Sequence, residues 1–600
     1  MVQSLSQSGN NAGLGTSPST NLGIGSFGTP VGLGVEGLTP GALNMATPGM
    51  GMGGVGMNVS MSDLGMTASG GQKRNEDEER RAKLRKVLRN IGTRKGRVSE
   101  EGIARVGRRA GFDNNFDLDK ETGNRTISSA GTKLIIDVVL KGDDPQKVQI
   151  MFDTENEQLT AQAEPAAKVL LDDLRPVGGP SLITDLDNYA ANLGRLAKID
   201  RLCKNQVNCF EALTGIHVSL QRLYEQERKG ADDSGVMRKK SGRPTMNAHG
   251  RLGLDLEYWQ TSMTNESKSG DSMEVDSDAQ AHDFDDGGAV HRLRISIEQS
   301  PAGLYPPIRL SDNWLPSPLE LEPTDLETAT SLPWQDPPLT FVPNAAEPSN
   351  PVSMHQQRQP DLRFIAKLEP ALVLPYQVAS TLSQSVGLPA PNLFVAQAWH
   401  ALLLNPSSSA PFENARDSKP TSADQRVLTM RGNAETEVTH RYTLDAIKAD
   451  MAFKLEELPF SHPRQLVEIL PTLRQWAFFS SMIRGAMVPD GPSCITTTKT
   501  QTPLNLADLL TTPITPPETA ETLSVSLSVV TSPAPSLSLV FPSRQPENLA
   551  RVAVQVGQNA DVAIISRQGI NDDLDDRAII KALELCGGDL GVWVEWLRSR

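Results

Sequence analysis

The sequence has few cysteines, few aromatic residues and no long uninterrupted apolar run. Its 600 residues include only four cysteines, Cys203, Cys209, Cys494 and Cys586, and no CxxC pair. This spacing fits neither a zinc site nor a dense disulfide framework, so we infer a reducing compartment, the cytosol or the nucleus. Aromatic residues make up 5% and hydrophobic residues 38% of the chain, and both fractions are low for a fully globular protein. Substantial parts of the chain are therefore expected to be disordered.

Signals for secretion or membrane insertion are also missing. The N-terminus lacks the basic and apolar regions of a signal peptide. The most apolar long window, Leu523 to Phe541, is interrupted by several serines and by Pro533 and Pro535. Such a segment cannot cross a bilayer as a helix, so we expect a soluble protein.

No motif for catalysis, cofactor binding or metal binding fits its context. Two GxGxxG matches, 23–28 and 32–37, lie in a glycine-rich tail without the strand and helix that a dinucleotide loop needs. No GxSxG elbow occurs, and the eight histidines form no HxxxH or HExxH pattern. The acidic stretch 271–286 lacks the spacing of a calcium loop and is typical of a solvated linker. We therefore predict no catalytic, cofactor-binding or metal-binding residues, and not an enzyme.

Charge is distributed unevenly along the chain. The formal net charge of −14 argues against a protein that coats nucleic acid along its whole length. The segment 73–109 nevertheless holds fourteen basic against six acidic residues, without the interleaved aromatics that would stack on bases. A second basic run, 238–244, is expected to be exposed and is similar to a minor-groove AT-hook, except that Ser241 stands where an arginine should precede the glycine. These two segments support one hypothesis, a stand-alone DNA-binding regulator.

Composition and periodicity predict an α+β protein with a long disordered leader and disordered linkers. The leader is rich in Gly, Ser, Thr and Met, with four Ser/Thr-Pro sites that suit phosphorylation. We predict five parts: the leader 1–72, a helix–hairpin–helix region 73–230, an acidic linker with a short strand 231–290, a β-rich body with proline-rich loops 291–545, and a strand with a C-terminal helical pair 546–600.

Within these parts the clearest patterns are a hairpin and several helices. Residues 133–140 and 147–152 are rich in β-formers and flank a turn sequence, which predicts the hairpin. Apolar residues at three- or four-residue spacing predict one long helix over 185–229, or a helical pair broken near Asn205–Asn208, and a further helix over 462–485. Pro165 is expected at the first position of another helix, 165–174. His217 and His400 lie among apolar residues and are expected to be packed or capping histidines.

One short motif is open to two interpretations. Leu506-Ala-Asp-Leu509-Leu510 matches LxxLL, which on a helix places three leucines on one face for a hydrophobic groove. Its Thr/Pro-rich flank favours exposure, whereas most such matches are turns of a packed core. The sequence alone leaves both interpretations in place.

Five blocks of the sequence occur in a fixed order: Gly96 to Gly111, Leu134 to Leu174, Asn192 to Glu227, Arg251 to Trp259, and Asp589 to Trp596. None of them contains a reactive site. Together they resemble the fungal form of the Mediator complex subunit 1 family, a resemblance that covers 75–260 well and the remainder loosely.

This resemblance implies a nuclear, non-catalytic subunit of the Mediator middle module without a cofactor. Its partners would be other Mediator subunits, transcription activators and the RNA polymerase II machinery, and direct contact with nucleic acid or membrane would not be needed. Animal relatives of this family contact nuclear receptors through LxxLL boxes in a long C-terminal tail. The resemblance does not assign that role to Leu506–Leu510, and no contact residue follows from it.

Overall fold

The computed structural model describes residues 80–86, 96–175, 184–205, 207–260, 290–300, 308–319, 332–343, 357–393, 396–405, 421–431, 434–446, 450–488, 522–544, 548–571 and 573–600. The chain divides into two units, Met1–Arg85 and Lys86–Arg600. The leader 1–72, the acidic stretch 271–286 and the LxxLL match all lie outside the described residues. The predictions made for them, like the five-part division of the chain, stay predictions.

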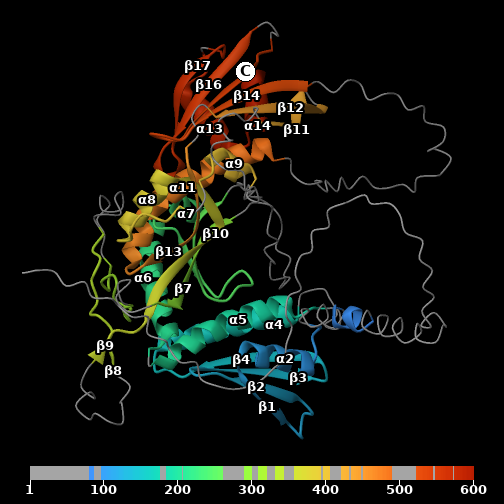
Figure 1. Cartoon of the computed structure of the whole chain (residues 1–600), viewed down its shortest axis with the longest axis vertical. Coiled ribbons are helices and arrows are strands. Elements are labelled where there is room, and N and C mark those ends of the chain that lie inside the picture. The colour runs from blue at the N-terminus through green and yellow to red at the C-terminus, as the bar shows by residue number, and fades with distance from the viewer. Residues whose placement is uncertain are drawn as a thin grey trace, which may run out of the picture. The chain divides into compact units, whose positions relative to one another are not determined.

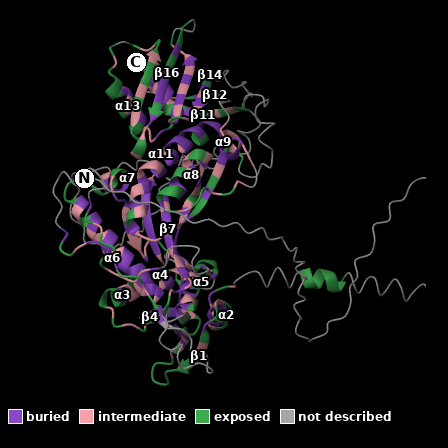
Figure 2. Ribbon diagram, turned by 60° about the vertical axis from the view of Figure 1, so that its left-hand side comes forward, coloured by how far each residue is buried: buried purple, intermediate pink, exposed green. Residues whose placement is uncertain are grey.

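A short basic helix, 80–86, is described by itself. All seven of its residues are exposed, including Leu84 at 57% (Figure 2). The helix lies within the run 78–92, whose apolar residues recur at helical intervals, and the rest of that run lies outside the described residues.

The first sheet of the larger unit has four antiparallel strands in the order β1-β2-β3-β4. Its strands are β1 (Asp113–Leu118), β2 (Arg125–Ala130), β3 (Leu134–Lys141) and β4 (Asp144–Phe152). The pairing of β3 with β4 confirms the predicted hairpin. Alternation along β3 buries Leu134, Ile136, Val138 and Leu140 on one face, which explains why one side of the sheet is covered by helices.

Five helices lie beside this sheet and the next one. They are α2 (Glu100–Ala110), α3 (Glu157–Ala161), α4 (Ala163–Leu174), α5 (Asp187–Leu202) and α6 (Cys209–Arg228). Helices α2, α3 and α4 contact strands of the first sheet, and α5 and α6 contact strands of the sheet that follows in the chain. A short 3-10 turn, η1 (Cys203–Asn205), separates α5 from α6, so of the two alternatives for this region the helical pair is correct. The predicted start of α4 was wrong: the helix begins at Ala163, so Pro165 occupies its third position, where its missing N–H is also harmless.

A five-stranded antiparallel sheet follows, in the order β13-β10-β7-β6-β5. Its strands β7, β10 and β13 are labelled in Figure 1. It consists of β5 (Arg243–Met246), β6 (Leu254–Gln260), β7 (Val290–Gln299), β10 (Leu362–Pro375) and β13 (Ala452–Phe460). The strands β8 (Val342–Pro343) and β9 (Gln357–Arg358) form a separate pair. One face of the five-stranded sheet is apolar, and the other is lined by charged residues in register.

The 25-residue helix α11 (Pro463–Met487) is the core element between this sheet and the C-terminal part. It confirms the helix predicted near 462–485. Pro463 at the first turn and a capping box of His462 and Gln465 define its start. Apolar residues surround the helix almost completely, which is typical of a buried rather than an amphipathic helix. Helices α7 (Asp233–Lys239), α8 (Tyr376–Ser385) and α9 (Trp399–Leu404) lie in the same body.

The last sheet has six strands in the order β11-β12-β14-β15-β16-β17. They are β11 (Thr421–Arg431), β12 (Ala434–Ala446), β14 (Thr522–Val530), β15 (Ser536–Pro542), β16 (Leu549–Val556) and β17 (Val562–Gln568). All neighbours are antiparallel except β12 and β14. Serines alternate with buried Leu and Val along β14, so the serines that interrupt this apolar window mark an amphipathic strand.

The chain ends on the predicted helical pair, α13 (Asp576–Leu585) and α14 (Leu590–Ser599). A 3-10 turn, η4 (Gln558–Ala560), joins β16 to β17 and packs on α11. The α+β fold, with its β-rich body and C-terminal helices, is as predicted. Among the described helices, none combines the length and the hydropathy that crossing a membrane requires.

Candidate functional site

The segment 238–244, predicted to be exposed, is folded into the body. Ser241, Gly242 and Pro244 are buried, and only Lys239 is exposed. Arg243 donates two hydrogen bonds to Glu257 Oε2, at 2.8 and 2.6 Å. The guanidinium of Arg238 lies over the ring of Trp259, 5.1 Å from its centroid. The prediction of exposure was therefore wrong. The segment pairs with a neighbouring strand and its arginines have partners within the fold, and neither fact can be read from its charge.

Arg474, on α11, is the side chain that connects this segment to the C-terminal part. It is fully buried, and its guanidinium donates to the carbonyl of Tyr258 at 3.1 Å, to Asn559 Oδ1 at 2.7 Å and to the carbonyl of Lys240. Three segments that are far apart in sequence thus meet on one guanidinium. Burial lowers the pKa of Arg474 to about 9, so the group is still charged at neutral pH.

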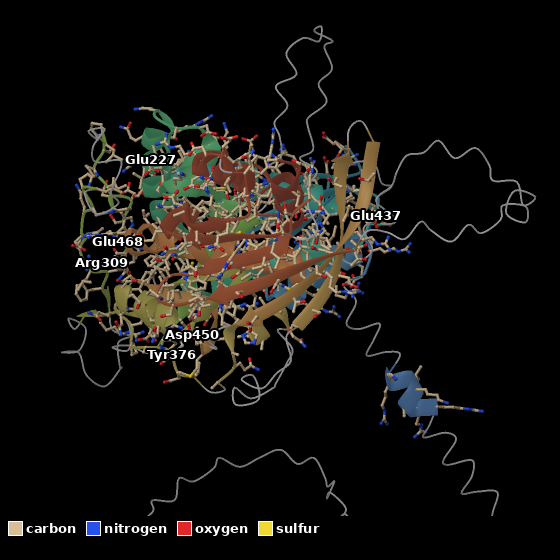
Figure 3. The ribbon with its side chains drawn as sticks, turned by 90° about the horizontal axis from the view of Figure 1, so that it is seen from above. Glu227, Arg309, Tyr376, Glu437, Asp450 and Glu468 are labelled. Carbon is tan, nitrogen blue, oxygen red and sulfur yellow. The ribbon has the colours of Figure 1, made fainter. Side chains whose placement is uncertain are left out.

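A buried carboxylate lies near Arg474. Glu227, at the end of α6 and labelled in Figure 3, accepts hydrogen bonds from the backbone N–H and the hydroxyl of Ser241. Burial raises the pKa of Glu227, and the hydrogen bonds from Ser241 act against this rise. Glu227 therefore holds the turn before β5 in place, and its negative charge also helps to balance Arg474.

A cavity of about 240 Å³ opens beside this junction. Its apolar floor is formed by Trp259 of β6 and Phe478 of α11, whose ring centroids are 5.4 Å apart. Its rim carries Arg238, Asp561 and Glu584, and Asp561 forms an ion pair with Lys239 at 3.1 Å. An apolar floor with a rim of both charges suits a side chain of a partner protein better than a reacting substrate.

His440, Tyr442 and Glu595 form a polar cluster that resembles a catalytic arrangement but is buried. His440 Nδ1 lies 3.0 Å from the hydroxyl of Tyr442, and Nε2 lies 3.0 Å from Glu595 Oε1. Burial acts to raise the pKa of Glu595, but hydrogen bonds from His440 and Arg598 outweigh it and lower the pKa. Because His440 is fully buried, this cluster can fix α14 on β12 but cannot meet a substrate.

The remaining residues singled out from the sequence do not converge. His217 and His400 are packed as expected, and burial lowers the pKa of both, that of His217 to about 4. Within the part of the chain that the structure describes, no group of three His, Cys, Asp or Glu side chains is arranged to hold a metal ion. The cysteines Cys203 and Cys209 are buried at the junction of α5 and α6.

Arg474, Trp259 and Asn559 were all missed at the sequence level. Arg474 is the only charged residue in the stretch 469–483 of α11, and a single charge within such a largely apolar stretch is a signal for a buried polar junction. Asn559 adopts a left-handed backbone conformation, φ 57°, for which no sequence pattern gave notice.

Comparison with known proteins identifies the chain's family. The family model of Mediator of RNA polymerase II transcription subunit 1 matches residues 85–487, which is more than half of the chain. The match ends at Met487, the last residue of α11. No match to a curated protein is found. The chain therefore belongs to the family of Mediator of RNA polymerase II transcription subunit 1.

Proposed function

We propose that this protein is a non-catalytic, nuclear subunit of the Mediator middle module that bridges gene-specific activators and the RNA polymerase II machinery. The observation that carries the proposal is the family match over 85–487, which contains the first two sheets and the whole of α11. Family membership supports association with other Mediator subunits and a role in transcription. The bridging role, the module and the nuclear location go beyond that membership.

The form of the described surface agrees with a role in binding proteins. The cavity beside Trp259 is of the size and polarity that accept an anchoring side chain. The short helix 80–86 presents five basic residues, all of them exposed, to a partner or to solvent. Both features supply contacts without any group positioned for acid–base or nucleophilic chemistry.

The experiment is affinity purification of the full-length tagged protein from nuclear extract, followed by mass spectrometry. We expect other Mediator subunits to co-purify in near-stoichiometric amounts. Recovery of the tagged chain alone, or with unrelated proteins only, would contradict the proposal. Loss of activators or polymerase alone, with Mediator subunits retained, would contradict only the bridging role.

The second candidate, a stand-alone DNA-binding regulator, retains one supporting observation, the exposed basic helix 80–86. The other segment on which it rested, 238–244, uses its arginines within the fold. The two functions differ in salt dependence: binding to duplex DNA that weakens steeply with salt and is lost on neutralising 80–86 would favour the second.

A further inference from the structure

The five-stranded sheet carries an arginine cluster on its charged face. Residues that face each other across antiparallel strands point to the same side of a sheet. Arg294 of β7 faces Asp255 of β6, and Arg292 of β7 faces Glu369 of β10. Arg195 of α5 and Arg251, from the turn before β6, interact electrostatically with the same groups. We name Arg195, Arg251, Arg292 and Arg294 the arginine cluster.

The carboxylates of Asp255 and Glu369 form ion pairs with most members of the arginine cluster. Asp255 accepts two hydrogen bonds from Arg294, at 3.1 and 3.2 Å. Glu369 lies 2.7 Å from Arg251 and 3.5 Å from Arg294. Asp173 is a further carboxylate near Arg195, and burial raises its pKa to about 6. Even with Asp173 counted, four guanidiniums exceed three carboxylates, so positive charge is in excess.

Arg292 is the member with the weakest internal partner. Its side chain is only 16% exposed, and its ion pair with Asp255 spans 3.9 Å, too far for a hydrogen bond. Glu257, which faces Arg292 on β6, is bound by Arg243 instead. Among the described residues, none accepts a hydrogen bond from Arg292. A mostly buried guanidinium with unused donors favours an additional anionic partner.

An acidic segment of the same chain is attached next to this cluster. Residues 261–289 connect the end of β6, Gln260, to the start of β7, Val290. They contain eight acidic residues and one basic residue, Lys268, a net charge of −7. Arg292 follows Val290 by two positions, about 7 Å along a strand. A tethered segment of opposite charge therefore has a high effective concentration at the arginine cluster.

We propose that the acidic segment 261–289 docks on the arginine cluster, with its carboxylates bound by Arg292, Arg251 and Arg195. Carboxylates and guanidiniums form charge-assisted hydrogen bonds, and the partly buried setting of the sheet face strengthens them relative to an exposed pair. An acidic segment of another protein competes for the same surface in this arrangement. The inference does not depend on the Mediator assignment.

The test uses the full-length chain and a synthetic peptide of residues 266–286 carrying a fluorophore. In a neutral-linker variant, the eight carboxylates are replaced: E266Q, D271N, E274Q, D276N, D278N, D283N, D285N and D286N. We expect the peptide to bind this variant, as measured by fluorescence anisotropy, and to bind the wild-type chain roughly tenfold or more weakly because the internal segment occupies the site. Raising the salt from about 0.05 M to about 0.3 M weakens the binding.

Substitutions on the sheet locate the contact. R251Q/R292Q in the neutral-linker background abolishes peptide binding, whereas R426Q/R551Q, two exposed positions on the six-stranded sheet, leaves it unchanged. Arg294 and Arg195 are kept, because they hold Asp255 and Asn192 in place. Three results would overturn the proposal: no binding to the neutral-linker variant, equal binding to the wild type, or equal binding to R251Q/R292Q.

A second measurement does not depend on the stability of the glutamine variants. In R251K/R292K, which keeps the charge and the natural linker, a zero-length carbodiimide couples the introduced amines to carboxylates that touch them. We expect mass spectrometry to show amide links from positions 251 and 292 to acidic residues of 266–286. Links from these positions only to Asp255 or Glu369 would contradict the docking.

Discussion

Truncation of the buried arginine of α11, R474A, removes one guanidinium that three segments share. The carbonyls of Tyr258 and Lys240 and the side chain of Asn559 each lose a buried donor. An unsatisfied buried polar group costs about 1–3 kcal/mol, so the gross loss is about 3–9 kcal/mol. Removing a buried charge offsets part of it, since burial already disfavours the guanidinium enough to lower its pKa. We expect a net loss of about 2–4 kcal/mol in the free energy of unfolding.

The measurement is thermal unfolding of the full-length chain, combined with hydrogen exchange. R474A lowers the melting temperature by several degrees, and exchange rises first around 238–242 and 556–561, the segments that Arg474 connects. R474M fills the volume but leaves the same acceptors unpaired, so it separates packing from hydrogen bonding. R464A, on the same helix but exposed and paired with Glu468, is the matched control and changes stability by less than about 0.5 kcal/mol. If R474A and R464A unfold alike, Arg474 does not connect these segments.

Three further predictions concern pH, a buried carboxylate and a glycine. Burial lowers the pKa of His291 to about 4. The unfolded chain therefore binds more protons than the folded one between pH 6.5 and pH 4, and the free energy of unfolding falls by up to about 3 kcal/mol as the pH drops through this window. H291Q should flatten the plot of melting temperature against pH, and an unchanged slope would refute this. Asp200 accepts hydrogen bonds from the backbone N–H groups of Thr132 and Lys133, both at 2.7 Å. D200N should therefore lower the free energy of unfolding by about 1.5–3 kcal/mol, as measured by urea unfolding. A loss below about 0.5 kcal/mol would contradict a stabilising role of this carboxylate. Gly588 has φ +84°, and a Cβ there would lie 2.7 Å from a ring carbon of Phe478, so G588A should lower the melting temperature whereas G123A, in open space at a similar φ, should lower it less.

Strong periodic patterns made much of the fold predictable. The alternation in 133–152 reflects the one buried face of a hairpin, and the apolar spacing in 462–485 reflects a buried helix. The structure contains both elements. The edge strand β1, Asp113–Leu118, was missed because five of its six residues are exposed and its sequence, DNNFDL, carries no apolar alternation. Its pairing with β2 comes from tertiary contact rather than from local preference.

The side-chain contacts around Arg474 and the segment 238–244 could not be predicted for a related reason. The basic run 238–244 looks exposed because its charges are counted without their partners, Glu257 and Trp259, which both lie on the neighbouring strand β6. Arg474 shows the reverse: its helix was predicted, but its acceptors come from positions up to 234 residues away. Non-local pairs of this kind leave no periodic trace in a single sequence.

Cross-linking mass spectrometry of the complex purified through the full-length tagged protein tests the central claim most directly. If the chain works as a Mediator subunit, cross-links connect residues of its body, 96–600, to other Mediator subunits. The account predicts such links from the rim of the cavity, including Lys239, and from the basic helix 80–86. A chain that purifies without Mediator subunits, or that cross-links only to itself, would contradict it.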